Sequence, residues 1–423
     1  MKTSTRGIGL AVVAGLLTIL VAVGAASAQA IQWTREFGAS GFDVARAIGW
    51  DESGVYAFGA VSGALPGQEF AGGPDDVFLR KYDFAGNELW TRQFGTAGDD
   101  FSMAGQVAVD DSAVYVAGWT DGALGETNAG DYDPFVRKYD LDGNVVWTDQ
   151  FGGSGYDDFD GIAATRGAVF VVGSVNGALP GQTAGGSWDG YIRRYDPDGE
   201  AVWTRQFGGR GSEDHHGVAA DETGVYVAGS ITAGRDFKGD SDALVIKYGF
   251  EGSVVWVRQF GTKAEDHLEG VAVRHGAVYV AGYTLGELPG QSSAGDADTF
   301  VRKYDVDGNE LWTRQFGTLG HDGRSFRGLA TDGRGVYVTG NVAGTLPGQT
   351  SAGGRDAFVR QYSHDGAELL TLQFGTSGDD RSIAIAVGAN DDVYIGGRTS
   401  GAFPGFTYAG GTDGFIAKIV KGE

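Results

Sequence analysis

The sequence contains no cysteine, 8 prolines and only 2 methionines among its 423 residues. Without cysteine no disulfide can close a loop, so stability must come from packing and strand pairing. The scarcity of proline, and glycine that does not recur at every third position, exclude a collagen-like chain. Basic residues are also scarce, 32 against 55 acidic ones. This argues against a nucleic-acid partner, because phosphate neutralisation needs clustered lysine and arginine.

Glycine is abundant, with 75 residues, and 42% of the residues are apolar. That apolar fraction is enough to build a core, which argues against general disorder. The surplus of glycine therefore predicts many tight turns in a folded protein. Short runs of β-branched and aromatic residues, bounded by glycine and aspartate, predict strands, and no window has a helical period.

The segment 1–30 has the pattern of a secretory signal. Lys2 and Arg6 precede an apolar run over 8–26, and small residues follow in Ala26-Ser27-Ala28-Gln29-Ala30. This order is typical of a cleaved signal peptide. An uncleaved membrane anchor is the alternative. We therefore predict an exported mature chain over 31–423, with no later stretch apolar enough to cross a bilayer.

One unit is repeated seven times at nearly equal intervals along the chain. Its first marker is Phe-Gly, with the phenylalanines Phe37, Phe94, Phe151, Phe207, Phe260, Phe316 and Phe374. Trp stands four residues before this Phe in six copies, and Leu370 stands there in the seventh. Its second marker is Val-Tyr or Val-Phe, at Tyr56, Tyr115, Phe170, Tyr226, Tyr279, Tyr337 and Tyr394. Regular repetition of this kind is the signature of a repeat architecture.

Each copy contains four segments with the composition of strands. In the clearest copy they are 270–273, 278–281, 299–304 and 310–316. Four strands repeated seven times predict a seven-bladed, all-β propeller with antiparallel blades. The mature chain begins with a fourth strand and ends with a third one. We therefore expect the N-terminal strand to complete the last blade, which removes an open sheet edge.

Repeats of the form Trp-Thr-Arg-Gln-Phe-Gly, Val-Tyr-Val-Ala-Gly, Leu-Pro-Gly-Gln and Asp-Ala-Phe-Val-Arg-Lys-Tyr-Asp resemble the SBBP repeats of bacterial seven-bladed propellers. The resemblance covers roughly residues 31–420. It implies the propeller fold and a bacterial setting in which the protein is secreted, periplasmic or on the cell surface. It implies no activity and no catalytic residues.

Two acidic positions recur on the face that should carry the long loops. The first holds Asp43, Asp100, Asp157, Glu213, Asp266, Asp322 and Asp380. The second opens the third strand and holds Asp76, Asp133, Asp189, Asp242, Asp298, Asp356 and Asp413. We expect these carboxylates to cap backbone N–H groups of their own loops. A ring of oxygen ligands for Ca²⁺ is the alternative, and no other cofactor is expected.

Three histidines depart from the repeat and lie beside carboxylates in consecutive copies: His215, His267 and His321. We expect solvated loop histidines here. A transition-metal site or an acid–base pair assembled between blades is the alternative. Arg302 and Arg314 alternate with aromatic residues, which predicts guanidinium stacking between blades.

The candidate binding residues are variable positions on the long-loop face: Trp119, Tyr283, Trp188, Tyr132 and Arg398. Aromatic residues beside aspartate suit carbohydrate stacking or a protein-binding hot spot. Packing of the loops onto one another is the alternative. The fourth copy lacks Leu-Pro-Gly-Gln, so its loop over 233–238 predicts a notch in this face.

These observations together predict a monomeric binding or scaffold propeller that recognises a protein or carbohydrate ligand. An extracellular glycan-acting hydrolase or lyase that uses the histidines is one alternative, and a surface-layer component is another. The sequence has no nucleophile elbow, phosphate loop or zinc-protease helix. Loops rather than the scaffold usually carry binding residues, so the long-loop face is the candidate surface.

Overall fold

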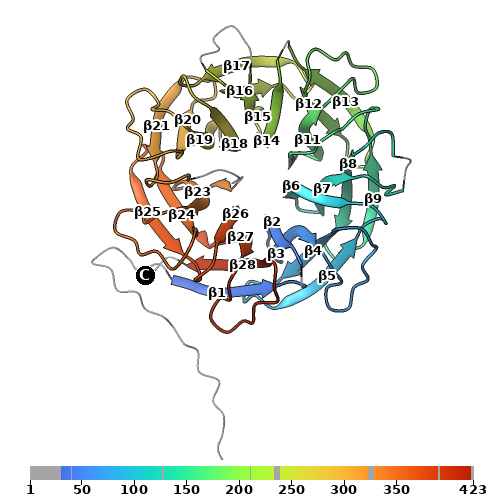
Figure 1. The fold of residues 1–423 in the computed structure, drawn as a ribbon. Coiled ribbons are helices and arrows are strands. Elements are labelled where there is room, and N and C mark those ends of the chain that lie inside the picture. The colour runs from blue at the N-terminus through green and yellow to red at the C-terminus, as the bar shows by residue number, and fades with distance from the viewer. Residues whose placement is uncertain are drawn as a thin grey trace, which may run out of the picture.

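A computed structural model describes residues 30–420, except 40, 126–127, 210, 233–238, 323–327 and 389–390. The predicted signal segment ends where these residues begin, and the predicted notch at 233–238 also lies outside them. The described residues form 28 strands arranged as seven four-stranded sheets around one axis (Figure 1). The predicted seven-bladed propeller is confirmed. No helix in this described part is long and apolar enough to span a bilayer.

Each antiparallel sheet runs outward from the axis in chain order, except that β1 is the outer strand of blade seven, and the strands are grouped here by their place in the blade. The inner strands are β2 (Asp43–Asp51), β6 (Asp100–Val109), β10 (Gly161–Thr165), β14 (Glu213–Asp221), β18 (Asp266–Arg274), β22 (Leu329–Thr331) and β26 (Asp380–Val387). The second strands are β3 (Gly54–Val61), β7 (Ala113–Thr120), β11 (Ala168–Val175), β15 (Gly224–Ile231), β19 (Ala277–Thr284), β23 (Gly335–Val342) and β27 (Val393–Thr399). The third strands are β4 (Asp76–Tyr82), β8 (Asp133–Asp140), β12 (Asp189–Tyr195), β16 (Asp242–Tyr248), β20 (Asp298–Tyr304), β24 (Asp356–Ser363) and β28 (Asp413–Val420). The outer strands are β5 (Glu88–Phe94), β9 (Val145–Gln150), β13 (Ala201–Phe207), β17 (Val254–Phe260), β21 (Glu310–Phe316), β25 (Glu368–Phe374) and β1 (Ala30–Phe37). Blades one to six are β2–β5, β6–β9, β10–β13, β14–β17, β18–β21 and β22–β25, and blade seven is β26–β28 with β1.

The inner strands differ from the sequence expectation at their start. In blade five the expected strand is 270–273, but β18 begins at Asp266 and passes through a bulge between Leu268 and Gly270. The same irregularity occurs in β2, β14 and β26. A bulge inserts one extra residue and so breaks the alternation by which a strand is recognised in a sequence.

The core lies between neighbouring blades. The second strands are buried along nearly their whole length, because a strand between two packed sheets has no solvent-facing side. The aromatic residue of the Val-Tyr marker is at most 1% exposed in all seven copies. One apolar cluster joins Tyr226 and Phe260 of blade four to Leu268, Val280 and Phe300 of blade five. A blade therefore buries its apolar faces only by standing beside two others.

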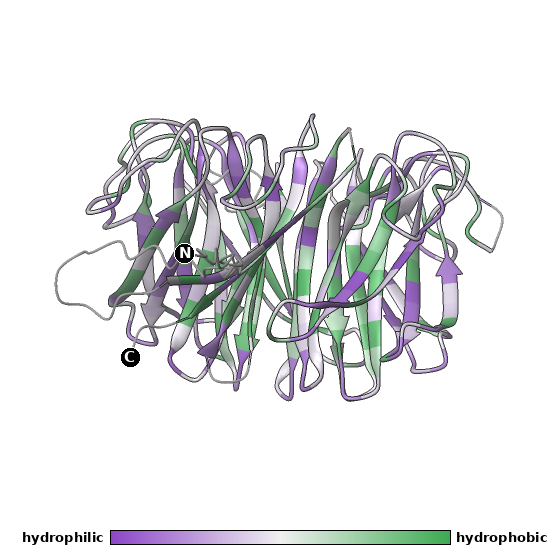
Figure 2. Ribbon diagram, turned by 90° about the horizontal axis from the view of Figure 1, so that it is seen from below, coloured by the Kyte–Doolittle hydropathy of each residue, from purple (hydrophilic) through white to green (hydrophobic). Residues whose placement is uncertain are grey.

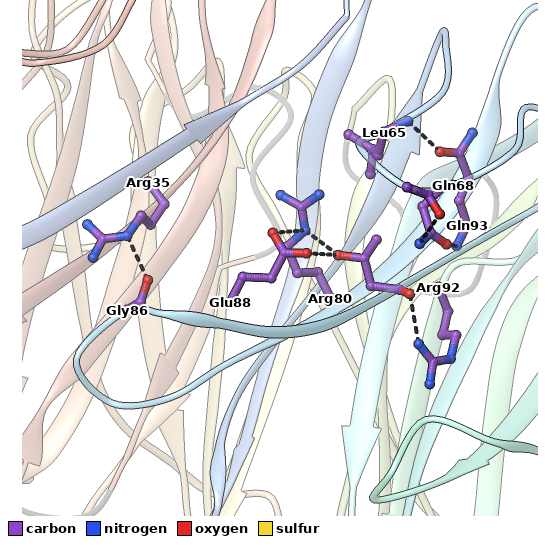
Figure 3. Close-up of polar contacts among 10 residues, drawn as sticks. Arg35, Leu65, Gln68, Arg80, Gly86, Glu88, Arg92 and Gln93 are labelled. Atoms are coloured by element: carbon purple, nitrogen blue, oxygen red, sulfur yellow. Dashed lines mark hydrogen bonds and ion pairs between the residues drawn. The ribbon is translucent and has the colours of Figure 1, made fainter.

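On every outer strand except β25 a tryptophan, usually with an arginine, contacts the hairpin turn of the next blade, and we call this contact the clasp. The indole N–H of Trp33 donates to the carbonyl of Phe84 at 3.2 Å. Arg35 Nε donates to the carbonyl of Gly86 at 2.6 Å (Figure 3). Glycine is needed in this turn, because φ is +82° at Gly86 and a Cβ there would lie 2.8 Å from the Trp33 ring. The clasp recurs as Arg92 to Gly143, Trp147 to Pro197, Trp203 to Phe250, Trp256 to Val306, Arg258 to Gly308, Trp312 to His364 and Arg314 to Gly366.

The clasp explains why the seventh copy of the repeat departs from the others. Strand β25 carries Leu370 and Leu372 where the other outer strands carry tryptophan and usually arginine. The blade that follows β25 is blade seven, whose third and outer strands, β28 and β1, lie far apart in the sequence and are not joined by a hairpin turn. With no turn carbonyls to accept hydrogen bonds, the two leucines pack instead in an apolar cluster that includes Ile31.

Arg302 stacks between blades, as the sequence predicts, whereas the Arg314 guanidinium lies 5.6 Å from the ring centroid of Trp312 on its own strand. The Arg302 guanidinium lies 3.7 Å from the ring centroid of Phe260, which belongs to the preceding blade. Its NH1 atom is 3.2 Å from a carboxylate oxygen of Glu310, and its Nε donates to the Thr313 hydroxyl at 2.8 Å. The arginine is 4% exposed, so its charge is satisfied inside the interface and is not offered to a ligand.

The N-terminal strand closes the ring, as predicted. Strand β1 pairs with β28 in antiparallel register from Ala30 opposite Val420 to Phe37 opposite Gly414. In Figure 1 the blue first strand lies beside the red last strand, on the outside of blade seven. The first strand thus covers the edge of β28 and supplies the clasp to blade one.

Removal of residues 31–37 tests this closure. The deletion exposes the edge of β28 and removes both clasp contacts from Trp33 and Arg35. We expect the melting temperature to fall by several degrees and the protein to aggregate, because an open sheet edge pairs with other chains. Thermal unfolding with light scattering measures both effects, and unchanged melting would contradict the closure.

Candidate functional site

The long loops gather on one rim of the propeller, and short hairpins form the other (Figure 2). The Leu-Pro-Gly-Gln motif pins a long loop to the outer strand of its own blade. Leu65 N donates to Gln93 Oε1 at 2.8 Å, and Gln93 N donates to Gln68 Oε1 at 3.0 Å (Figure 3). Leu65 is 2% exposed. The motif therefore holds the loop in place, which leaves recognition to other residues of this face.

The first acidic position caps its own loop in every copy. Asp43 Oδ2 accepts the N–H of Ala39 at 2.7 Å, and Asp380 Oδ2 accepts the N–H of Thr376 at 2.6 Å. The corresponding carboxylates Asp100, Asp157, Glu213, Asp266 and Asp322 also accept the N–H four residues earlier. The predicted capping role is confirmed for these seven residues. Capping satisfies backbone donors that would otherwise be buried without a partner.

The second acidic position lies against the first across the Gly of the Phe-Gly marker. A Cβ on Gly95 would lie 2.5 Å from Asp76 Oδ1 and 2.7 Å from Asp100 Oδ2. Gly38, Gly152, Gly261, Gly317 and Gly375 are enclosed by a pair of carboxylates in the same way. The marker is therefore glycine because two buried carboxylates leave no room for a side chain.

Burial next to another carboxylate makes these acids hard to ionise. Desolvation raises the pKa of Asp43, Asp100 and Asp157 to about 6 each. The neighbouring acid adds to the shift, as Asp76 does for Asp100. The capping N–H groups oppose it, because they stabilise the charged form.

No group of three or more histidine or acidic side chains suited to a metal ion occurs in the described part of the chain. Oxygen atoms of Asp76, Asp133, Asp298, Asp356 and Asp413 are nevertheless buried without a hydrogen-bond partner. The Ca²⁺ ring thus stays a prediction, in which each junction would offer two carboxylates rather than a complete ligand set.

The three predicted histidines occupy different environments, and the expectation of solvated loop histidines is wrong for His215, which lies buried on strand β14. His215 is 0% exposed, with its Nδ1 3.2 Å from the carbonyl of Tyr191, and burial lowers its pKa to about 4. His267 lies half-buried, stacked on Tyr283 at 5.0 Å, with its Nε2 2.8 Å from the Ser241 hydroxyl. His321 is exposed, 3.8 Å from Asp296. A neutral core histidine such as His215 is suited to packing, so the histidine set gives little support to acid–base catalysis.

Aromatic rings from blades two and three make a continuous row on the long-loop face, which we call the aromatic arc. It consists of Phe101, Trp119, Tyr132, Tyr156 and Trp188. Ring centroids of successive members are 5.4, 4.5, 4.8 and 5.6 Å apart. Trp119 is buried at 5% exposure and supports the row from below, whereas Tyr132, Tyr156 and Trp188 are half-buried.

Three of the five predicted binding residues, Trp119, Tyr132 and Trp188, thus meet in the aromatic arc. The other two lie elsewhere on the rim. Tyr283 is 9% exposed under His267 in blade five, and the Arg398 guanidinium in blade seven lies 5.0 Å from the ring of Phe42. Sequence reasoning missed Tyr156, whose backbone pairs with that of Tyr132 in a short parallel bridge between blades.

The rim surrounds a central channel of about 350 Å³. All seven inner strands line it, mostly with alanine, valine and isoleucine, together with the polar residues Arg46, Gln106 and Thr331. The side chains that line it are mainly small and aliphatic, and the five residues of the aromatic arc are not among them.

No model of a protein family matches the chain. The chain is 28% identical over 409 residues to the regulatory protein FlaEY of Caulobacter vibrioides, which covers 90% of this chain and 39% of the relative. It thus spans about two fifths of the length of that relative. Among solved structures, the WD40 domain of Neurospora crassa Pan2 aligns with a TM-score of 0.50 and 9% identity over 89% of each chain. The Doa1 WD40 propeller aligns with a TM-score of 0.48 and 14% identity over 93% of this chain and 97% of that one. At such identities, the likeness to Pan2 concerns the fold alone.

Substitution of Gly95 by alanine tests the carboxylate pairs. The new Cβ would contact Asp76 and Asp100 below van der Waals distance. We expect a loss of about 1–3 kcal/mol in the free energy of unfolding, as for other overpacked sites. Urea denaturation measures it, and Gly333→Ala is the control because no atom lies within 4 Å of its Cβ position. Equal effects of the two substitutions would contradict the account.

The raised carboxyl pKa values predict that stability increases as the pH falls from 8 to 5. Asp43, Asp100 and Asp157 have pKa values of about 6 in the folded protein, above the value of about 3.9 in unfolded chains. Their stabilising contribution is complete below that unfolded value and is lost as the pH rises through 6. Asp83, Asp140 and Asp305 have lowered pKa values and oppose the trend only at lower pH. His215, whose pKa is lowered to about 4, opposes it below about pH 6.5, but it is one group against three.

Urea midpoints at pH 8, 7, 6 and 5 measure this dependence. A midpoint that stays constant or falls between pH 8 and pH 5 would refute it. Added Ca²⁺ at pH 8 tests the alternative, since an ion that binds the carboxylate pairs raises the midpoint and flattens its pH dependence.

Proposed function

We propose that the chain is a non-catalytic binding module that holds a protein partner against its long-loop face. The observation that carries this proposal is the aromatic arc. Its three outer rings, Tyr132, Tyr156 and Trp188, are half-buried, and each is fixed by contact with the next ring of the row. Rigid aromatic rings lose little entropy on binding and dominate the energy of protein interfaces.

The surroundings of the arc also favour a binding role. Glutamines of the outer strands fix the long loops beside it at Leu124 and Leu179, so its rings are presented on an ordered surface. The propeller fold supports a binding or scaffold module, and the relative from Caulobacter vibrioides carries the name of a regulatory protein. His215 is buried with a pKa of about 4, which makes the glycan-acting enzyme the less favoured alternative.

We further propose that the protein acts outside the cytoplasm, as a secreted, periplasmic or surface-displayed bacterial protein. The signal pattern of the segment 1–30 supports this, and so does the SBBP resemblance of the repeats. A complete lack of cysteine is compatible with an oxidising compartment, because no free thiol is present there to cross-link.

The double substitution Tyr156→Ser and Trp188→Ser tests the binding role. Immobilised wild-type protein and the double variant are exposed to the same cell-envelope extract, and each protein retained only by the wild type is purified and titrated. We expect affinity to fall by about tenfold or more in the variant, as for hot-spot truncations. The control is Leu89→Ser, which removes an apolar side chain of 52% exposure from the outer strand β5, away from the aromatic arc.

A partner that binds wild type, control and double variant with equal affinity would place recognition outside the aromatic arc. A glycan array probed with the same three proteins covers the carbohydrate alternative. Glycan binding that depends on Tyr156 and Trp188 would replace the protein partner by a carbohydrate.

A further inference from the structure

Two arginines stand directly opposite each other at the mouth of the channel in blade seven. Arg381 of β26 and Arg398 of β27 are cross-strand partners in the antiparallel register. Directly opposed side chains share one face of the sheet about 5 Å apart at Cβ, where like charges repel. Other blades fill this position without such a conflict, with Val44 opposite Ala60, Phe101 opposite Trp119, Asp214 opposite Ser230 and His267 opposite Tyr283.

The two arginines have no direct polar partner among the described residues. Neither guanidinium forms a hydrogen bond or an ion pair with the part of the chain that the structure describes. Both side chains are half-buried. Burial lowers the pKa of Arg398 and Arg381, and a neighbouring arginine lowers each further, Arg381 for the former and Arg355 for the latter.

One acid lies near this group. Asp379 acts on the charges of both Arg381 and Arg398, and its Oδ1 accepts the backbone N–H of Arg355 at 3.0 Å. Arg381 and Arg398 therefore share one nearby carboxylate, and Arg355 adds a third positive charge close to Arg381. An aromatic ring also contacts this group: the centroid of the Phe42 ring lies 5.0 Å from the Arg398 guanidinium and 5.9 Å from that of Arg46.

This positive cluster belongs to a strongly acidic protein, with a net charge of −23. Acidic side chains are abundant enough to have supplied partners, as Glu310 does for Arg302. Partly desolvated guanidinium groups without a carboxylate partner are what an oxyanion needs, because each presents a fork of N–H donors that matches two oxygens.

We propose that Arg381 and Arg398, with Arg355 beside them, form a binding site for an oxyanion, either a phosphate or the carboxylate of an acidic sugar. The oxyanion bridges the two opposed guanidinium groups at the channel mouth and replaces their repulsion by attraction. This site goes beyond the protein-binding role of the aromatic arc, and its test needs no protein partner.

Thermal unfolding and isothermal titration calorimetry with inorganic phosphate and with glucuronate test the site. The full chain is compared with Arg381→Gln and Arg398→Gln, and chloride at equal ionic strength is the reference. Arg274→Gln is the control, because Arg274 is an exposed arginine at the opposite mouth of the channel. We expect a saturable rise in melting temperature for wild type and control, and affinity weakened by about tenfold or more in both glutamine variants.

The chloride reference separates a binding role from a structural one. Removing one of two like charges should leave the melting temperature in chloride unchanged or higher. A glutamine variant that is less stable in chloride would show that the pair is already neutralised inside the protein and would overturn the proposal. So would a wild type that responds to neither oxyanion, or variants that respond as strongly as wild type. The ligand that binds with the higher affinity, phosphate or glucuronate, shows whether the site takes a phosphate or the carboxylate of an acidic sugar.

Discussion

The clasp between an outer strand and the next hairpin turn is the interaction on which the rest of this structure depends. A four-stranded blade with two apolar faces cannot fold alone, because each face needs a neighbouring sheet to exclude water. The clasp fixes how two sheets meet. The indole of Trp33 covers Gly86 and donates to the turn beside it, and Arg35 donates to the turn itself. With neighbouring sheets held together in this way, buried arginines such as Arg302 stack on a ring of the neighbouring blade.

The fold could be predicted from the sequence because each marker of the repeat is a physical requirement of every blade. Tryptophan and the turn glycine make the clasp, and the Gly of Phe-Gly fits between two carboxylates. The start of the inner strands could not be predicted, because the bulges there break the alternation of side chains. The bulge in β14 also hides from the sequence which histidine is buried. His215 and His216 are adjacent in sequence, yet the first lies in the core against Phe207 and the second faces His267 at 6.5 Å. A shift of one residue exchanges the two faces of a strand.

The candidate site could be predicted only as a face of the molecule. The sequence indicates which positions vary among copies, and these positions do lie at the rim. It does not indicate which of them meet, since Tyr132 and Tyr156 are joined by a bridge between blades that no local pattern encodes. One cross-strand position of the scaffold carries aromatic rings in blade two, a histidine–tyrosine stack in blade five and two arginines in blade seven. The repeat thus keeps the same strand pairing in each blade, while the side chains at this cross-strand position differ from blade to blade.

The pairing of β1 with β28 has a consequence for the order in which the parts of the protein fold. Strand β1 can pair with its neighbour only after β28 has been synthesised, so blade seven stays incomplete until then. Contacts between such distant parts of a chain form late and slowly. Until β1 pairs with β28, Trp33 is not held in position to clasp blade one. The ring of seven blades therefore closes only after β28 has been synthesised, in a long-range step that joins two strands far apart in the sequence.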